Sequence, residues 1–125
     1  MMIRQIGQIM LYVHNQDEAV KFWTEKIGFR VISEENEEMR WIEMAPVKGT
    51  ETSIILHDKQ MVAKMEPEMN LGTPSLMFFT DDIDEWRRDL LSKGVRVGEI
   101  VQMPSGRVCN FADNEDNYFA VMEKQ

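Results

Sequence analysis

Two stretches of the sequence share one pattern: YVHNQDEA at residues 12–19 and FTDDIDEW at residues 79–86. Each follows an apolar run that is typical of a strand, and each leads through an amphipathic helical pattern to a glycine and another strand pattern. The acidic pairs of the two stretches lie 67 positions apart, but Gly28 and Gly94 lie 66 apart, so the copies slip by one residue along the helix. Two copies of this length indicate a duplicated module, and we expect a cleft where the halves meet.

The spacing of turns and apolar runs predicts a βαβββ order in each half. Strands are expected over residues 6–13, 29–33, 40–45, 52–57, 75–79, 95–102, 108–112 and 118–122, and helices between Asn15 and Gly28 and between Asp82 and Gly94. We therefore predict an α+β fold of two pseudo-symmetric βαβββ modules in one domain. The first module covers residues 1–57, a connector covers 58–74, and the second module covers 75–125.

Two shorter segments also have a predicted structure. Met61, Met65 and Met69 are spaced four apart in the connector, which predicts a short helix that is interrupted at Pro67. The acidic run at residues 34–38 is typical of a solvated turn.

Composition limits the partners of the chain. It has 43% hydrophobic and 29% charged residues, a net charge of −8 and a single cysteine. The scattered basic residues argue against binding to nucleic acid or to an anionic membrane. One cysteine excludes an internal disulfide and suits a reducing compartment, and no apolar run is long enough for a signal region or a membrane span. We expect a cytoplasmic protein.

The order of these motifs resembles a known superfamily. The segments DEAVKFW at 17–23 with IGF at 27–29, RWIEMAP at 40–46, KGV at 93–95 and FAD at 111–113 are similar to those of the vicinal oxygen chelate superfamily. That superfamily contains glyoxalase I, bleomycin- and fosfomycin-resistance proteins and extradiol dioxygenases. The resemblance covers nearly the whole chain and implies a homodimer. NED at residues 114–116 departs from the family's Pro-Asp-Gly.

The resemblance also implies where metal ligands would lie. In metal-dependent members they come from the first, fourth, fifth and eighth strands, which corresponds here to Gln8, Ile55, Ser75 and Ala120. Isoleucine and alanine cannot bind a metal, and serine is a rare ligand. We therefore expect no metal cofactor.

Strand alternation divides each strand between a helix-facing side and a cleft-facing side. The residues that we expect to bind a ligand in the cleft are Gln8, Met10, Tyr12, Trp41, Ser75, Met77, Phe79, Ala120 and Met122. This set is mostly apolar with a few polar groups, as in small-molecule pockets. Trp41 is expected to stack on the ligand and Gln8 to orient it.

His57 and Glu43 are the candidate catalytic residues. The turn at residues 46–50 would bring His57 near Trp41 with Glu43 close by, and a histidine beside a carboxylate can act as an acid–base pair. Two alternatives stay open: His57 is a partly solvated strand-end residue without a role, or Gln8, Glu43 and His57 form a displaced metal site.

Two functions therefore remain. The missing metal ligands favour a small-molecule-binding protein of the bleomycin-resistance type that sequesters an apolar or aromatic compound. The alternative is a lyase, isomerase or dioxygenase of the glyoxalase type that uses a rearranged metal site or His57 as a base. The fold does not decide between them, and the sequence identifies neither the ligand nor the pathway.

Overall fold

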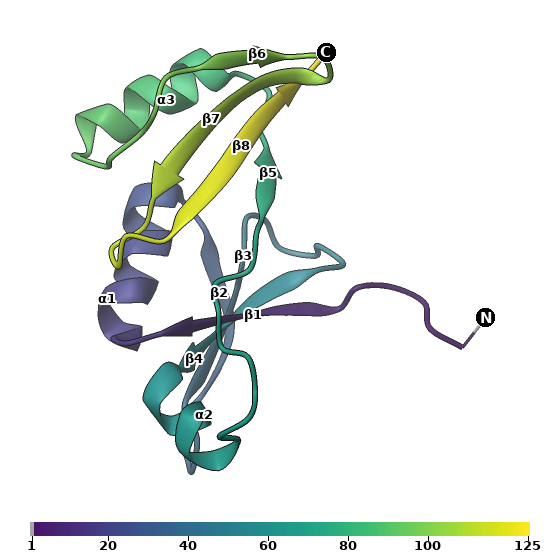
Figure 1. Ribbon diagram of the computed structural model, residues 1–125, viewed down its shortest axis with the longest axis vertical. Helices are drawn as coiled ribbons and strands as arrows, with labels where there is room; N and C mark the ends of the chain where they lie inside the picture. The colour runs from purple at the N-terminus through teal and green to yellow at the C-terminus, as the bar shows by residue number, and fades with distance from the viewer. Residues whose placement is uncertain (1) are drawn as a thin grey trace. The chain divides into compact units, whose positions relative to one another are not determined.

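The computed structural model describes residues 2–125 and divides into two compact units, unit 1 (Met1–Pro74) and unit 2 (Ser75–Gln125). Each unit contains one four-stranded mixed sheet with a helix against it (Figure 1). This confirms the predicted α+β fold of two βαβββ modules. Whether the two modules make one domain stays a prediction.

The elements of unit 1 follow the expected order. They are β1 (Gln8–Val13), α1 (Gln16–Lys21), η1 (Phe22–Ile27), β2 (Arg30–Glu35), β3 (Trp41–Ala45), β4 (Ser53–Asp58) and α2 (Lys59–Met65). The strand order is β1-β4-β3-β2, in which β1 and β4 are parallel and the other pairs are antiparallel. The short helix predicted in the connector is confirmed as α2, which ends before Pro67.

The first helix changes type along its length. Asn15 caps it by accepting a hydrogen bond from the backbone N–H of Glu18, and α1 then continues into the π-helical segment η1. Gly28 ends the helix in a left-handed conformation at φ 94°, which glycine adopts without steric cost. A π-helix holds more residues per turn than an α-helix, so η1 accommodates the one-residue slip between the two copies.

The core of unit 1 lies between the helix and one face of the sheet. The largest side chain in it is Trp23, which is 0% exposed and packs its ring 5.2 Å from that of Phe29. The sheet contributes alternate, fully buried residues: Leu11, Val13, Ile42, Met44 and Leu56. The opposite face, which we call the open face of unit 1, carries Tyr12, Trp41 and His57, all of them partly exposed. The alternation in the sequence therefore predicted the two faces of β1, β3 and β4.

Unit 2 repeats this plan with shorter edge strands. Its elements are β5 (Met77–Phe79), α3 (Ile83–Ser92), β6 (Val101–Met103), β7 (Gly106–Ala112) and β8 (Tyr118–Lys124), with the strand order β5-β8-β7-β6. The core packs Ile83 and Leu90 of α3 against Phe111, Phe119 and Val121 of the sheet. Cys109 is also buried here, and burial raises the pKa of its thiol.

The two units share more than their topology. Asp82 caps α3 by accepting from the N–H of Glu85, as Asn15 caps α1. Arg107 binds Asp84 in unit 2 with N–O distances of 2.8–2.9 Å, and Arg40 binds Asp17 in unit 1 at 2.8 Å. Both members of the second pair lie 67 positions before those of the first, so the duplication extends to individual side-chain contacts.

The structure differs from the sequence prediction in two places. The strand expected over 95–102 is wrong for most of its length: only Val101 and the two residues after it form β6, while Val97 makes an isolated bridge to Phe111. The acidic run also contributes Glu34 and Glu35 to β2, because they pair with Ile42 and Trp41 of β3.

Gly106 is the first residue of β7. A side chain there would overlap the backbone carbonyl oxygen of Glu123, so the close approach of two strands requires glycine.

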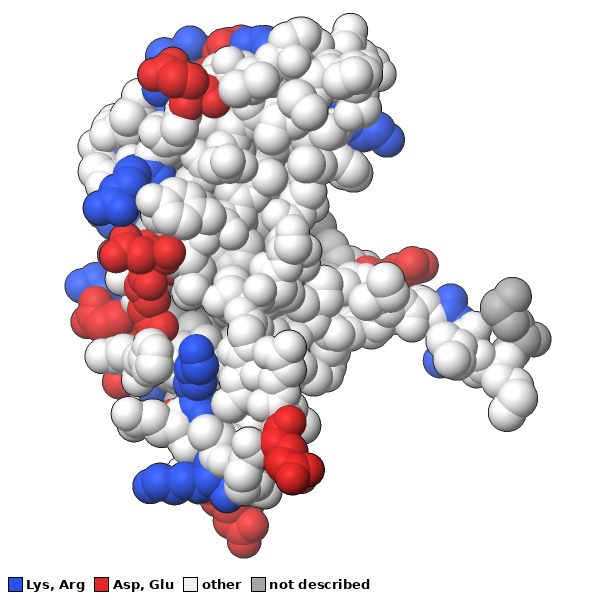
Figure 2. Space-filling view, viewed as in Figure 1, with Lys and Arg blue, Asp and Glu red and all other residues white. Residues whose placement is uncertain are grey.

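Basic and acidic side chains are interspersed on the face shown in Figure 2. No helix among residues 2–125 has the length and apolar character that crossing a membrane would need.

Candidate functional site

Three rings form a row across the open face of unit 1. Strand register places Tyr12 of β1 beside His57 of β4, and His57 beside Trp41 of β3. The Tyr12 and His57 rings stack with centroids 5.9 Å apart and planes inclined by 21°. Cross-strand neighbours project on the same side of a sheet, so the row offers flat surfaces to one side of unit 1.

This row borders a hollow in the open face. The hollow has a volume of about 330 Å³ and is lined by Gln8, Met10, Trp41, Ile55 and His57. Met10 and Ile55 are neighbours in the parallel pair β1–β4, and they supply an apolar surface next to the aromatic row. The size and the mixed lining are those of a small-molecule site.

His57, one of the residues that line this hollow, has a ring nitrogen without a hydrogen-bond partner among the described residues. Its Nδ1 atom is buried and has no hydrogen-bond partner among residues 2–125. Burial lowers the pKa of His57 below its ordinary value of 6.5, so the imidazole is neutral at neutral pH. A neutral imidazole can accept a hydrogen bond or a proton.

Glu43 lies one row further along the same face, opposite Ile55. Its Oε1 accepts a hydrogen bond from Ser33 at 2.8 Å, and its Oε2 accepts one from Ser53 at 2.6 Å. Hydrogen bonds from Ser53, Ser33 and Gln8 lower the pKa of Glu43 against the opposing effect of burial, so the carboxylate is ionised. Glu43 is thus bound by serines rather than by His57, and the expected acid–base pair stays a prediction.

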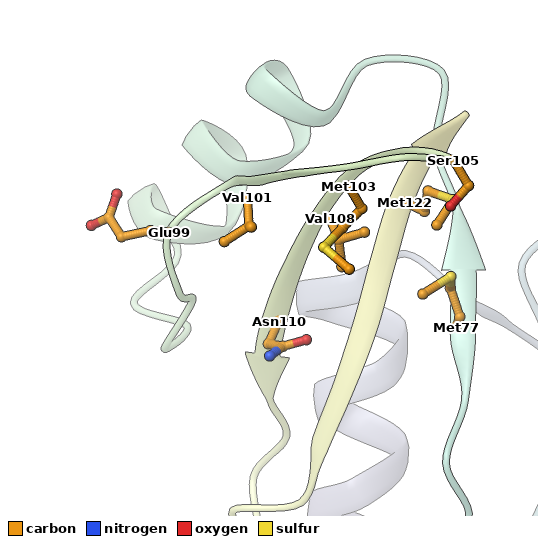
Figure 3. A pocket seen from close by; sticks show the side chains of 8 residues that line it. All are labelled: Met77, Glu99, Val101, Met103, Ser105, Val108, Asn110 and Met122. Carbon is orange, nitrogen blue, oxygen red and sulfur yellow. The ribbon is translucent and has the colours of Figure 1, made fainter. Parts of the chain in front are cut away.

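Unit 2 has a second hollow, which differs in chemistry. It has a volume of about 430 Å³ and is lined by Met77, Glu99, Val101, Met103, Ser105, Val108, Asn110 and Met122. Figure 3 shows side chains from β5, β6, β7 and β8 around it, with the Glu99 carboxylate directed away from the methionines. Thioether and aliphatic groups make this surface soft and apolar.

The expected ligand-binding residues divide between the two units. Gln8, Met10, Trp41 and His57 line the hollow of unit 1, with Tyr12 stacked on His57. Met77 and Met122 line the hollow of unit 2. Ser75 is exposed just before β5, Ala120 pairs with Met77, and Phe79 is 65% exposed with the Lys124 ammonium 5.1 Å from its ring centre; none of these three is among the lining residues.

Sequence reasoning missed two groups of residues. Ser33 and Ser53 surround Glu43, and alternation along β2 and β4 could have identified them, although a bulge between Val31 and Ser33 changes the register. Val101 and Met103 line the hollow of unit 2, and the wrong strand prediction over 95–102 concealed them.

The positions that the family uses for metal ligands carry a poor set of donors. Ile55 is aliphatic and 3% exposed, and Ala120 is also aliphatic, which leaves only Gln8 and Ser75 with oxygen atoms. Within the described part of the chain, no three His, Cys, Asp or Glu residues gather in a group that could hold a metal ion. The absence of a metal cofactor stays a prediction.

Comparison with known proteins identifies the family. The model of the Glyoxalase/Bleomycin resistance protein/Dioxygenase superfamily matches residues 5–121. The chain belongs to this superfamily. Among relatives of this superfamily member is the uncharacterized protein YetH of Bacillus subtilis (strain 168), 36% identical over 125 residues that cover 98% of this chain and 100% of YetH. YurT of the same organism is 30% identical, covering 91% of this chain and 94% of YurT.

Solved structures of superfamily members share the fold. The antibiotic binding protein TnmS3 from Streptomyces sp. CB03234 has a TM-score of 0.85 and 29% identity, with 100% of this chain and 99% of TnmS3 covered. A superfamily member from Sphaerobacter thermophilus DSM 20745 has a TM-score of 0.82 and 23% identity, with 99% and 100% covered. The second likeness supports the fold alone. The resemblance inferred from the sequence is confirmed.

Proposed function

We propose that this superfamily member binds an apolar or aromatic small molecule. The observation that carries the proposal is the row Tyr12–His57–Trp41 beside a hollow of about 330 Å³. The rings supply stacking surfaces, while Gln8 and His57, which both line the hollow, supply polar groups that would orient a ligand. Similarity to TnmS3, an antibiotic binding protein, supports a role in ligand binding rather than in catalysis.

Residues of unit 2 belong to the proposal as well. Met77, Phe79, Ala120 and Met122 lie on one face of paired strands β5 and β8, and Ser75 precedes them. Met77 and Met122 line the apolar hollow of unit 2, which would accept an aliphatic or polarizable part of a ligand. Isothermal titration calorimetry with a panel of neutral aromatic compounds tests the proposal, which requires saturable binding that depends on the open face of unit 1.

A second candidate function is a lyase, isomerase or dioxygenase reaction in which His57 acts as the base. The neutral imidazole of His57, which lines the hollow, favours it, because a general base must be unprotonated to accept a proton. The same reactions could instead use a metal ion bound at a rearranged site of Gln8, Glu43 and His57.

Metal content and activity separate the two candidates. We expect less than one divalent ion per purified chain by elemental analysis, and no turnover of the methylglyoxal–glutathione hemithioacetal with added nickel, zinc or manganese. One tightly held ion per chain would favour the second candidate, and Glu43 and His57 would then be the first residues to test as ligands.

We also propose that the protein is a cytoplasmic homodimer. Two-fold symmetric dimers are the commonest closed assemblies, and the free, buried Cys109 suits a reducing compartment. Light scattering at micromolar concentration tests the assembly, and the mass of a single chain would contradict it.

A further inference from the structure

The carboxylate of Glu43 is a negative charge without a positive partner. Its three hydrogen-bond donors, Ser53, Ser33 and Gln8, are all neutral. None of the ion pairs within residues 2–125 includes it. Hydroxyl and amide donors stabilise an ionised carboxylate but leave its charge in place. The open face of unit 1 therefore carries an uncompensated negative charge next to its hollow.

Neighbouring charged groups do not cancel it. Glu35 of β2 lies opposite Trp41 and adds a second carboxylate to this face. Arg40 precedes Trp41 but pairs with Asp17 and Glu34. Arg30, opposite Ala45, lies nearer to Glu43 along β3, but it is in none of the ion pairs within residues 2–125. The net charge of −8 adds a long-range attraction for cations.

The row of Tyr12, His57 and Trp41 also favours cations over anions. Cations bind over the faces of tryptophan and tyrosine rings, because the ring quadrupole places negative potential there. Trp41 lines the hollow, and Tyr12 stacks on the neutral His57 next to it. An aromatic surface, a neutral imidazole and an unpaired carboxylate together suit an ammonium group that is attached to an apolar body.

We propose that the hollow of unit 1 selects organic cations, meaning apolar or aromatic molecules that carry an amine or a quaternary ammonium group, over carboxylates and phosphates. This rests on the proposed function and adds the charge of the ligand to it. The ammonium group would lie on the side of Glu43 and the apolar body on Met10, Ile55 and Trp41.

Three probes with one ring system test the charge preference. They are (naphthalen-2-ylmethyl)trimethylammonium, 2-naphthalenemethanol and 2-naphthoate, each titrated calorimetrically into the full chain at low and high sodium chloride. We expect the ammonium probe to bind about tenfold or more tighter than 2-naphthoate, because a single unscreened charge contact is of that size. The advantage should shrink in high salt, whereas affinity for the alcohol should not fall.

Glu43→Gln is the decisive variant, because it keeps the shape of the side chain and removes its charge. We expect this substitution to lower the affinity for the ammonium probe about tenfold and to leave the affinity for the alcohol nearly unchanged. Glu25→Gln is the matched control: it removes the same charge from η1, outside the lining of either hollow, and should leave the preference intact.

The outcomes distinguish a failure of charge selection from a failure of the proposed binding function. If the alcohol binds and weakens on Trp41→Ala, but the ammonium probe has no advantage over 2-naphthoate, charge selection is wrong and aromatic binding stands. If no probe binds, both are wrong. If Glu43→Gln does not fold, the salt dependence of the wild-type affinities decides: an advantage of the ammonium probe that high salt leaves unchanged would overturn the inference.

Discussion

The open faces of units 1 and 2 differ in chemistry although their strands pair in the same way. His57 pairs with both Tyr12 and Trp41 in unit 1, and the corresponding row in unit 2 is Phe79, Met122 and Val108. One further row along, the charged Glu43 of unit 1 corresponds to the neutral Asn110 of unit 2. One face is aromatic and charged, and the other is rich in methionine and aliphatic groups.

The helix-covered sides have changed much less. Each unit keeps a polar cap three residues before a glutamate N–H, and each keeps an arginine–aspartate pair at corresponding positions. Contacts that hold the helix on the sheet are shared, whereas the groups that face outward are not. The difference indicates that the scaffold is common to both copies, whereas the open faces have diverged in chemistry.

The largest expected effect concerns the tryptophans on the covered sides. Trp23→Ala should lower the free energy of unfolding by about 3–5 kcal/mol, because it removes a side chain that is 0% exposed and leaves a cavity. Trp86→Ala should cost less, since Trp86 is only half-buried, although its ring lies 5.7 Å from that of Phe111. Chemical denaturation measures both. Equal losses would contradict a greater contribution of the fully buried Trp23.

Ligand binding should depend on one open face more than on the other. Trp41→Ala should weaken the binding of 2-naphthalenemethanol about tenfold, because the stacking surface is lost. Val108→Ala is the matched control at the corresponding position of unit 2 and should change the affinity less than twofold. Calorimetric titration compares the two. A greater loss with Val108→Ala would place the ring in the hollow of unit 2.

The two arginine–aspartate pairs should differ in strength. Arg107 binds Asp84 through both of its terminal nitrogens, whereas Arg40 reaches a single oxygen of the more exposed Asp17. Bidentate pairs are the stronger kind, so Asp84→Asn should destabilise the protein more than Asp17→Asn. The midpoint of urea denaturation at low salt measures the difference, and the reverse order would contradict it.

The smallest effect concerns pH. Because burial lowers the pKa of His57 below 6.5, the unfolded chain takes up a proton at this residue before the folded chain does. Stability should therefore fall as the pH drops from about 6.5 toward the folded-state pKa. His57→Met, which copies the residue of unit 2, should flatten this part of the stability profile. An unchanged slope between pH 6.5 and 5 would show that His57 does not cause it.

Local patterns predicted much of this molecule, and they failed where long-range contacts decide. The caps at Asn15 and Asp82 and the stop at Gly28 were readable, because each depends on neighbours within a few residues. Alternation also separated the two faces of β1 and β3. The residues before Val101 have the pattern of a strand, but only Val97 bridges to β7. Pairing with a distant strand leaves no signal in the local sequence.

The candidate site was predicted in part for the same reason. Alternation placed Gln8, Trp41 and His57 on one face, and the structure places them around one hollow. It did not reveal that Ser33 and Ser53 hold Glu43, because that depends on the pairing of three strands and on a bulge in one of them. Pairing partners and their hydrogen bonds need the fold.

The π-helical segment η1 explains how the two halves could diverge in helix length. Once a module has been copied, a residue added within a helix normally rotates every later side chain by about 100° and disrupts the buried stripe. A wide turn absorbs the extra residue locally, so Trp23 stays buried and Gly28 still ends the helix. Helices in such duplicated proteins can therefore change length by one residue while both halves keep their inherited architecture.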